Sequence, residues 1–449
     1  MADTRVIIIG AGPAGLAAAA ELARAGQDCV LIDQRATPGG AIHRQPAHPS
    51  RTIPMSRVAR LRFESLMKGI ATPRVQFRGL SHFLGVDGDG FALIEDRTNG
   101  RVEKLAAKAI ILATGAVEKI RPVQGWELPG VSTAGGMQVM LKETGIAPQG
   151  RILLAGNGPL LVALAAQLIR AGNPPLALVE AANPMTKPLT ALGLLRHPAL
   201  LGEAAGFTFD VLRSGLPWMR GASLVRIEQA GSALAAVIRQ ADGQETRIEV
   251  DRIALHDGIR ENRIGLPQTN LQDAPIIVHA GDCRQTLGAP AAVCDGARAG
   301  RQVAALLGAK ACDVAKLERQ LARQVAAQKR LARIFSPVAA LPALKDLPDE
   351  TVICRCEGST VGSLKALLSV KDGLSGREVK HNGRFAMGNC QGRFCAANTA
   401  ALMAQLRPDM PEASEADLTG RRWPIRPVSI AALLSAAPAE QTNDHEVRL

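Results

Sequence analysis

The stretch RVIIIGAGPAGLAAAAELARAG, residues 5–26, decides the fold of this chain. A short apolar segment runs into a glycine turn, and a helix rich in alanine and leucine follows and ends in Ala-Gly. The next apolar segment, CVLID, ends at Asp33. Strand, glycine turn, helix and strand, in this order, form a βαβ unit whose helix packs back on two parallel strands. The chain therefore opens with an α/β fold.

The same pattern returns in RILLAGNGPLLVALAAQLIRAG from Arg151, which leads to LALVE at Glu180. Each copy continues into β-rich alternating sequence and a further apolar strand, AIILATG in the first and RIALHDG in the second. IIVHAGDC, residues 276–283, and the helix-like segment after it predict that the chain returns to complete the first copy. Two tandem Rossmann-like domains are expected, in an α/β fold.

The predicted boundaries follow from these segments and from the proline-bearing stretches between them. A first dinucleotide-binding domain is expected over residues 1–122 and 246–310, and a second over 123–245. A helical linker (311–345), a small cysteine-bearing domain (346–407) and a tail (408–449) follow. RRWPIRPVSI in the tail is expected to pack along a neighbouring surface.

Composition narrows the class of protein. The 449 residues include 47% hydrophobic ones, enough for several buried cores, and the net charge is +12. Tyrosine is absent, aromatic residues make up 3%, and no dense Lys/Arg block occurs, so nucleic-acid binding is not favoured. Apolar runs are too short to span a bilayer, and the amino terminus lacks a secretory signal. We expect a cytoplasmic protein, and peripheral contact with the inner face of the membrane stays open.

The first glycine loop, GAGPAG, fits a dinucleotide. Gly10 allows the tight turn, Gly12 lets a pyrophosphate approach the backbone, and Gly15 lets the helix pack on the strand. The amino terminus of the helix offers free N–H groups to phosphate. Asp33, at the end of the second strand, is placed to accept hydrogen bonds from a ribose.

The second glycine loop, GNGPLL, departs from this rule. Gly156 and Gly158 are present, but Leu161 stands at the third position and should push the helix away from the strand. Glu180 still permits a ribose contact. No arginine follows closely to hold a 2′-phosphate, so NADP is the least favoured ligand. NAD, an adenine nucleotide and an empty fold all remain open.

Four of the eight cysteines form two short pairs, ICRCEGST and GNCQGRFC. Cys354, Cys356, Cys390 and Cys395 match the ligand count of a [2Fe–2S] cluster or of tetrahedral zinc. Structural zinc more often uses C-x-x-C at both ends, so the C-x-C and C-x₄-C spacings favour iron and sulfide. The segment after Gly40 contains no cysteine, which excludes the dithiol chemistry of flavin disulfide reductases.

GAGPAG, the PGG at Pro38–Gly40, the ATG at Ala113–Gly115 and the AGD at Ala280–Asp282 together resemble the FAD-dependent oxidoreductases with two dinucleotide-binding domains, of glutathione-reductase-like fold. The resemblance implies that FAD is bound at Gly10, Gly12, Pro13, Ala14, Gly15, Asp33, Gly39, Gly40, Ala113, Thr114, Gly115, Gly281 and Asp282, with Asp282 on the ribityl chain. CRCE and CQGRFC resemble the bacterioferritin-associated-ferredoxin-like (BFD-like) [2Fe–2S] domain.

Over nearly its whole length the chain resembles the family of the opine oxidase A subunit, the hydrogen cyanide synthase B subunit and the alpha subunit of D-hydroxyproline dehydrogenase. The resemblance implies an electron-transfer subunit with FAD and a [2Fe–2S] cluster. An FAD-containing beta subunit would oxidise a C–N bond of an amino acid, imino acid or opine. A small ferredoxin-like gamma subunit, and a second flavin (FMN) at a subunit interface, are further implied alternatives.

Two segments depart from these relatives, and two other functions stay open. HDGIREN lacks a proline before its asparagine, and AIHR (Ala41–Arg44) replaces a glutamine and a tyrosine, which affects local flavin contacts. The alternatives are a self-contained NADH-dependent flavoprotein reductase, which Leu161 disfavours, and a non-catalytic scaffold subunit. No catalytic acid or base can be assigned, because lone histidines such as His43, His48 and His256 are more often structural.

Overall fold

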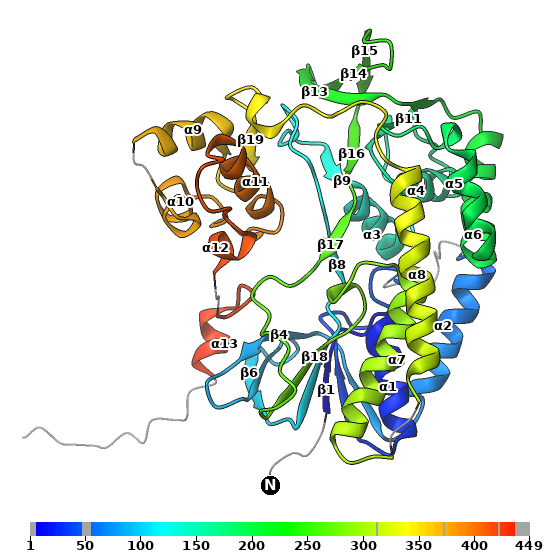
Figure 1. Cartoon of the computed structure of the whole chain (residues 1–449), viewed down its shortest axis with the longest axis vertical. Helices are drawn as coiled ribbons and strands as arrows, with labels where there is room; N and C mark the ends of the chain where they lie inside the picture. The colour runs from blue at the N-terminus through cyan, green and yellow to red at the C-terminus, as the bar shows by residue number, and fades with distance from the viewer. Residues whose placement is uncertain (1–5, 47–54, 311–312, 371–372, 421–422, 436–449) are drawn as a thin grey trace, which may run out of the picture.

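The computed structural model describes residues 6–46, 55–310, 313–370, 373–420 and 423–435. A first α/β unit is built on a parallel five-stranded sheet of order β18-β7-β1-β2-β3 (Figure 1). Its strands are β1 (Val6–Ile9), β2 (Cys29–Ile32), β3 (Val75–Arg78), β7 (Ala109–Leu112) and β18 (Ile276–His279). The return of the chain at β18 is therefore confirmed.

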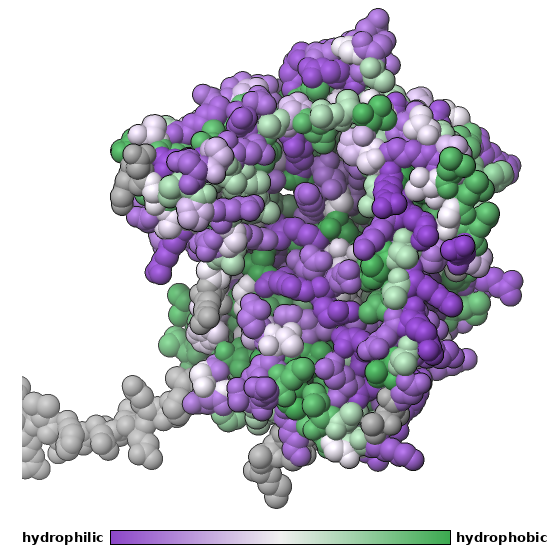
Figure 2. Space-filling model, in the orientation of Figure 1, coloured by the Kyte–Doolittle hydropathy of each residue, from purple (hydrophilic) through white to green (hydrophobic). Residues whose placement is uncertain are grey.

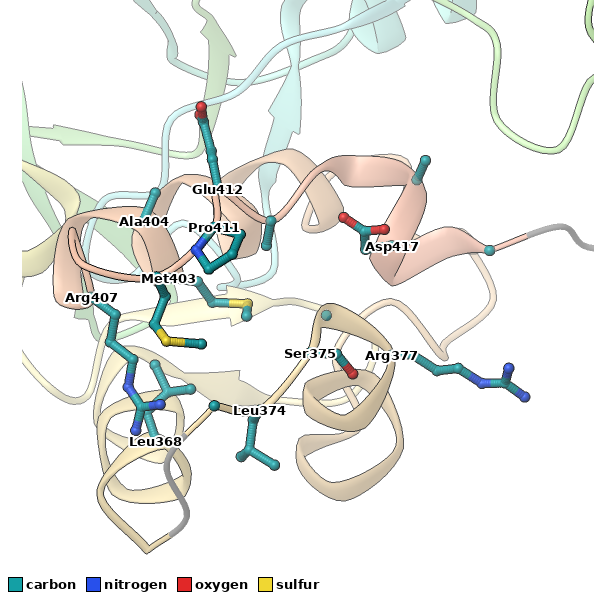
Figure 3. Close-up of a pocket in the computed structure, with 16 residues that line it drawn as sticks. Leu368, Leu374, Ser375, Arg377, Met403, Ala404, Arg407, Pro411, Glu412 and Asp417 are labelled. Atoms are coloured by element: carbon teal, nitrogen blue, oxygen red, sulfur yellow. The ribbon is translucent and has the colours of Figure 1, made fainter.

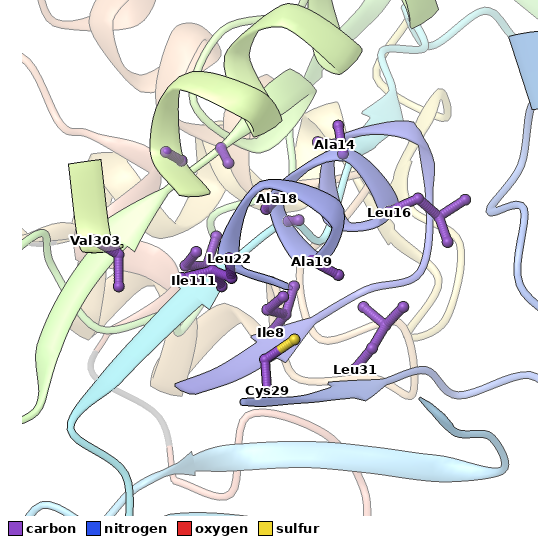
Figure 4. Close-up of a cluster of buried hydrophobic side chains, with 14 of the residues drawn as sticks. Ile8, Ala14, Leu16, Ala18, Ala19, Leu22, Cys29, Leu31, Ile111 and Val303 are labelled. Carbon is purple, nitrogen blue, oxygen red and sulfur yellow. The ribbon is translucent and has the colours of Figure 1, made fainter. Parts of the chain in front are cut away.

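Small residues hold the helices of this unit close to one another and to the sheet. Helices α1 (Pro13–Arg24) and α7 (Ala289–Leu306) cover one face, and α2 (Arg57–Ile70) packs beside α1. Figure 4 shows the alanines of α1 facing Ile8 and Ile111 of the sheet, with Val303 of α7 alongside. A Cβ at Gly296 of α7 would lie 2.0 Å from the backbone oxygen of Ala14, so only glycine fits there.

The other face of the first sheet is covered by an antiparallel meander of β4 (Ser81–Val86), β5 (Ala92–Asp96) and β6 (Arg101–Leu105). Buried side chains from both sheets form one core between them. The carboxy-terminal tail packs on this meander: the Ile425 amide donates to the Leu84 carbonyl at 2.9 Å, and α13 (Ile430–Leu434) lies beside β6. The expected packing on a neighbouring surface is confirmed for residues 423–435; Arg421 and Arg422 lie outside the described residues.

A second α/β unit repeats the plan with a parallel sheet of order β12-β11-β10-β16-β9. Its strands are β9 (Val131–Thr133), β10 (Ile152–Gly156), β11 (Ala177–Glu180), β12 (Trp218–Arg220) and β16 (Arg252–His256). Helices α3 (Ala134–Thr144), α4 (Pro159–Arg170) and α6 (Pro198–Arg213) form one core with this sheet, and α5 (Pro188–Leu192) precedes α6. The strands β13 (Ser223–Ala230), β14 (Ala233–Arg239) and β15 (Glu245–Val250) cover its other face.

This topology differs from the boundary at residue 246 that the sequence suggested. β15 pairs with β14, and β16 pairs with β10 and β9, so residues 246–256 belong to the second unit. The chain leaves that unit along β17 (Ile259–Glu261), which pairs antiparallel with β8 (Ala116–Glu118). This two-stranded ribbon connects the two units.

Helix α8 (Ala315–Ile334) packs against α7 and α5 and leads to the carboxy-terminal unit (Figure 1). That unit contains β19 (Val352–Cys354), β20 (Ser359–Thr360), α9 (Val361–Val370), α10 (Gly376–Gly383), α11 (Ala396–Leu406) and α12 (Glu415–Thr419). It has its own core, centred on the fully buried Phe385. None of the helices among the described residues has the length and apolar content needed to cross a bilayer.

Candidate functional site

The first glycine loop leaves open space only where a ligand would need it. A Cβ at Gly10 would lie 2.4 Å from the Ala113 oxygen, and one at Gly15 would lie 1.8 Å from the Gly10 oxygen. At Gly12 the nearest heavy atom would be the Cα of Gly40, at 3.8 Å. Gly12 is also the N-cap of α1 and offers no side chain to its N–H groups. The loop is thus a cradle of free N–H groups at a helix amino terminus, which suits a phosphate.

The PGG and AGD turns converge on this loop. The Gly39 amide donates to the Ala11 carbonyl at 2.8 Å, and a Cβ at Gly40 would lie 2.8 Å from the Cα of Gly12. Gly281 approaches α1 so closely that its Cβ would lie 2.5 Å from the Cβ of Ala14. Three segments far apart in the sequence therefore form one wall.

Asp33 is part of the loop's support as well as a candidate ribose ligand. Its carboxylate is 8% exposed; Oδ2 accepts a hydrogen bond from the Ala11 amide at 2.6 Å, and Oδ1 accepts one from the Arg35 amide at 2.9 Å. Each carboxylate oxygen can accept a second hydrogen bond, so a ribose contact remains available.

The ATG turn is fixed by Asn262, a residue that sequence reasoning noted only for its missing proline. The Thr114 hydroxyl donates to the Asn262 carbonyl at 3.0 Å, and the Asn262 side chain donates to the Thr114 carbonyl at 3.2 Å. The next residue, Gly115, has a φ of +75°, and a Cβ there would meet nothing within 4 Å. The ATG turn thus faces open space and is joined to the end of β17.

Asp282 and Asp295 hold the AGD turn. Asp282 Oδ1 accepts from the Leu287 and Gly288 amides at 2.9 and 3.0 Å, and burial raises the pKa of this carboxyl. Asp295, 2% exposed, accepts from the Gly281 amide at 2.8 Å. Burial opposes ionisation of Asp295, but hydrogen bonds from Arg284 and the nearby Arg298 outweigh it and lower its pKa. Sequence reasoning missed Asp295, because nothing in the helix pattern of α7 marks it.

Polar contacts also tie the segment after PGG to the second unit. Lys142 of α3 donates to the carbonyls of Ala41 and Ile42 at 3.2 and 3.1 Å. Glu143, the next residue of α3, forms ion pairs with Arg35 and Arg44. The two units are therefore joined here as well as by the ribbon.

The two described histidines that the sequence raised as candidates are buried. Burial, then the charges of Arg62 and Lys142, lower the pKa of His43 to about 4, so its ring is neutral at pH 7. The His256 Nδ1 lies 3.0 Å from a Glu118 oxygen, and this carboxylate also accepts from the first amides of α3. Both ring nitrogens of His43 are buried without a hydrogen-bond partner among the described residues, whereas His256 is held by Glu118; His48 lies outside the described residues.

The second glycine loop has a different environment. Glu180 is 0% exposed, one of its oxygens accepts from the Gly158 amide at 2.8 Å, and burial raises its pKa to about 8. Leu161 is fully buried in the helix core. Because a Cβ at the matching Gly15 would collide with the turn, accommodating Leu161 requires α4 to stand further from its turn than α1 does.

The four clustered cysteines come together in the carboxy-terminal unit. Cys354 ends β19, and Cys395 is the N-cap of α11. The Cys395 thiol shares hydrogen bonds with those of Cys354 and Cys390, and Cys390 also contacts Cys356. Gly388 allows this approach, because a Cβ there would lie 2.1 Å from that of Cys356. Two loops separated in sequence thus place four sulfur atoms in one cluster.

The environment favours the thiolate form at Cys354 and Cys390, whereas burial raises the pKa of Cys356, and the hydrogen bonds to Cys354 and Cys390 raise the pKa of Cys395. Hydrogen bonding from Cys395 lowers the pKa of Cys354 to about 6 and that of Cys390 to about 5, and backbone amides also donate to both. Cys354 and Cys395 are buried, whereas Cys356 is exposed. The donor set fits a thiolate-bound metal centre with one edge at the surface. Among the described residues, no group of three or more His, Cys, Asp or Glu side chains lies in an arrangement that could hold a metal ion.

The carboxy-terminal unit docks on the second α/β unit and on the ribbon. Trp126, 1% exposed, donates from Nε1 to the Val352 carbonyl at 2.6 Å, and Arg355 stacks over its ring. Arg260 of β17 donates to the Arg393 carbonyl, within the Cys390–Cys395 loop, at 2.6 Å and pairs with Glu415. Two residues after Arg260 lies Asn262, which holds the ATG turn. The cysteine loop and the ATG turn are thus joined through one short strand.

A separate cavity of about 530 Å³ lies in the carboxy-terminal unit (Figure 3). Leu368, Leu374 and Met403 line its interior, and Arg377 and Arg407 lie at its sides. None of the four clustered cysteines lines it, so it is distinct from the sulfur site.

Comparison with known proteins matches residues 4–286 to the family model described as pyridine nucleotide-disulphide oxidoreductase. The A subunit of opine oxidase from Rhizobium meliloti is 30% identical, over 94% of this chain and 97% of that protein. This chain belongs to the pyridine nucleotide-disulphide oxidoreductase family and, within it, to the group that contains the opine oxidase A subunit. It is an oxidoreductase, and the resemblance to the opine oxidase A subunit is confirmed.

Two further relatives extend this result. Hydrogen cyanide synthase subunit HcnB of Pseudomonas aeruginosa is 29% identical, over 88% of this chain and 91% of that protein. The crystal structure of L-proline dehydrogenase from P. horikoshii superposes with a TM-score of 0.63 at 19% identity and covers 96% of this chain and 79% of that one. That likeness shows the fold, and the expected pair of Rossmann-type units is confirmed.

Proposed function

We propose that this chain is the FAD- and [2Fe–2S]-binding electron-transfer subunit of a multi-subunit dehydrogenase that oxidises an amino acid, imino acid or opine. The names of its relatives, which are subunits of opine oxidase and hydrogen cyanide synthase, support the substrate class and the partner. The observation that carries the proposal is the connection described above: Arg260 joins the loop of Cys390 to the ribbon that starts at the ATG turn.

The chain's own residues have distinct roles in this proposal. The glycine loop would bind the FAD pyrophosphate, Asp33 the ribose, and the turns held by Asn262 and Asp295 the flavin end. Cys354, Cys356, Cys390 and Cys395 would bind the cluster. Flavin exchanges two electrons with an organic partner and a [2Fe–2S] cluster passes them singly, so the pair converts one mode of transfer into the other.

A partner surface is available on the second α/β unit. Large apolar side chains are exposed along residues 185–212, and they lie over α5 and α6 at the right of Figure 2. They are Met185, Leu189, Leu192, Leu195, Phe209 and Leu212. Contiguous exposed apolar side chains mark interaction surfaces in soluble proteins. We place the substrate-oxidising beta subunit here; a gamma subunit and an interfacial FMN remain open in this proposal.

The test is cofactor analysis of the chain purified without oxygen. We expect non-covalent FAD, iron and acid-labile sulfide, with an electron paramagnetic resonance signal of a reduced [2Fe–2S] cluster. Zinc without sulfide would overturn the electron-transfer role. Oxidation of D-hydroxyproline or an opine by the chain alone, with an artificial acceptor, would refute the division of labour between subunits.

A further inference from the structure

After α8 the chain crosses the carboxyl edge of the second parallel sheet before it reaches the carboxy-terminal unit (Figure 1). We call residues 335–338 the strap. In Rossmann-type sheets this edge, outside the carboxyl ends of the strands, is where nucleotides bind. The strap therefore lies where a second dinucleotide would be expected.

The strap is attached at three successive strand ends. After β10, the Asn157 side chain donates to the Phe335 carbonyl at 2.6 Å. After β11, the Val338 amide donates to the Ala181 carbonyl at 3.0 Å, and Ala182 pairs with Pro337 in an antiparallel bridge. After β12, the side chain of Val338 lies against Gly221: a Cβ on that glycine would be 3.5 Å from it.

Further hydrogen bonds tie the strap to the loops that follow β10 and β11. The Asn157 oxygen accepts from the Ala182 amide at 3.1 Å, so one side chain of the glycine loop links both β11 and the strap. Lys187 donates to the Ser336 carbonyl at 3.1 Å and to the Arg333 carbonyl at 2.9 Å. Glu180, the candidate ribose ligand, is entirely shielded from solvent.

We infer that the strap takes the place of the adenosine half of a dinucleotide, so that strap docking and nucleotide binding at the second glycine loop exclude each other. A ribose can reach Glu180 only if residues 335–338 leave the strand ends. The second unit then binds the chain's own linker in place of a nucleotide. This inference does not rest on the presence of FAD or of a cluster elsewhere in the chain.

Hydrogen exchange of the full chain, with calorimetric titration of NADH and ATP, tests the inference. Excess FAD is present, so that the first loop does not bind the probes. We expect no binding and slow exchange of the Val338 amide. Binding accompanied by faster exchange at Val338 would also support mutual exclusion. Binding with Val338 still protected would overturn the inference, as would exchange of the Val338 amide at the rate of an unstructured peptide.

A matched pair of variants separates the strap from general stability. Asn157→Ala removes both links of this side chain, and we expect at least tenfold faster exchange at Val338. Asn173→Ala is the control, because Asn173 donates to the Pro148 and Gly150 carbonyls of the same unit, away from the strap. Equal effects of the two variants at Val338 would contradict the role of Asn157. If Asn157→Ala fails to fold, the titration of the unmodified chain still decides.

Discussion

The loop after β1 and the loop after β10 share a backbone plan. Each turns from a parallel strand into an apolar helix with proline at its first position, and each has a carboxylate at the end of the next strand that accepts from a loop amide. Their surroundings differ. The first loop faces the PGG and AGD turns with room at Gly12, whereas the second lies under the strap. The comparison teaches that glycine spacing alone does not decide whether such a unit can bind a nucleotide. A segment that crosses the carboxyl ends of the strands, as the strap does, matters as much.

The largest effect should come from filling the first loop. Gly12→Val places a side chain where the pyrophosphate would lie, and we expect FAD affinity to fall by roughly a hundredfold or more. Gly12 has a φ of −77°, which suits any residue, so the chain should still fold. Released flavin is measured by fluorescence. The control, Leu160→Ala at the start of α4 after the second loop, should keep its FAD; flavin loss from both variants would break the comparison.

Removing one sulfur ligand should test the cysteine site of the carboxy-terminal unit, which docks on the second unit. Cys390→Ser takes away one of four thiolates, and we expect iron and sulfide contents to fall close to zero while FAD stays bound. Cys294→Ser is the matched control, because Cys294 lies in α7, outside the cysteine cluster. Full iron content in Cys390→Ser would exclude this residue as a ligand.

If the second unit binds the partner subunit through its exposed apolar side chains, acidic substitutions on α5 should weaken assembly with that subunit. Leu189 and Leu192 are 83% and 58% exposed, so the double change Leu189→Glu, Leu192→Glu should fold normally. Charges at the centre of an apolar interface weaken binding by about a hundredfold or less. Co-purification and binding titration measure this. Val370→Glu, at an equally exposed apolar position on α9, should assemble normally; loss with both variants would argue against a specific surface.

A smaller effect is expected where the ribbon between the units meets the cysteine loop. Arg260→Met combined with Glu415→Gln removes the link to the Arg393 carbonyl without leaving an unpaired carboxylate. We expect electron transfer from photoreduced flavin to the cluster to slow by about tenfold, with FAD and iron contents unchanged. Glu415→Gln alone should transfer at nearly the normal rate. An unchanged rate in the double variant would show that Arg260 does not position the loop.

Glu180 offers the finest test, through the pH dependence of stability. Burial raises its pKa to about 8, so the native chain retains a proton that the unfolded chain releases above about pH 4.5. The free energy of unfolding therefore decreases as pH rises through this window. Glu180→Gln should remove this pH-dependent loss of stability. We expect the free energy of unfolding to be unchanged by the substitution at pH 4 and to rise by about 2 to 4 kcal/mol at pH 8. Chemical unfolding at pH 4 and at pH 8 measures the free energy of unfolding. The control, Glu249→Gln at an exposed position of β15, should change it equally little at both pH values.

The sequence predicted those parts of the fold that short stretches of glycines and apolar residues determine by themselves. The two βαβ openings, the return at β18 and the convergence of GAGPAG, PGG and AGD follow from glycines and apolar runs that need no distant partner to be recognised. The boundary at residue 246 was misplaced, because β15 and β16 have the same alternating and apolar character whichever sheet they join. Only the pairing of β15 with β14, and of Ile253 in β16 with Leu153 and Val131, assigns them to the second unit.

The sequence could not predict the strap or the residues that hold the turns. SPVAALPALKDLP has no periodicity that marks it as more than a linker, and the contact of Asn157 with Phe335 spans 178 residues. Asn262 likewise acts on a turn 148 residues away, whereas Asp295 acts on a turn only 14 residues before it, from a position in α7 that its helix pattern does not mark. The four cysteines were easier to single out from the sequence, because thiolate side chains bind only a limited range of metals wherever the fold brings them together.

The insertion of the second unit within the first has a consequence for biosynthesis. β7 pairs with β1 on one side and with β18 on the other, and α7 packs on α1 through Gly296 and Gly300. A nascent chain on the ribosome therefore lacks the edge strand and one covering helix of its first unit until about residue 306 has emerged. The inserted unit is complete some fifty residues earlier, at β16. Of the two α/β units, the one that is begun first is therefore completed second, and the apolar β7 edge of its sheet stays unpaired in the interval.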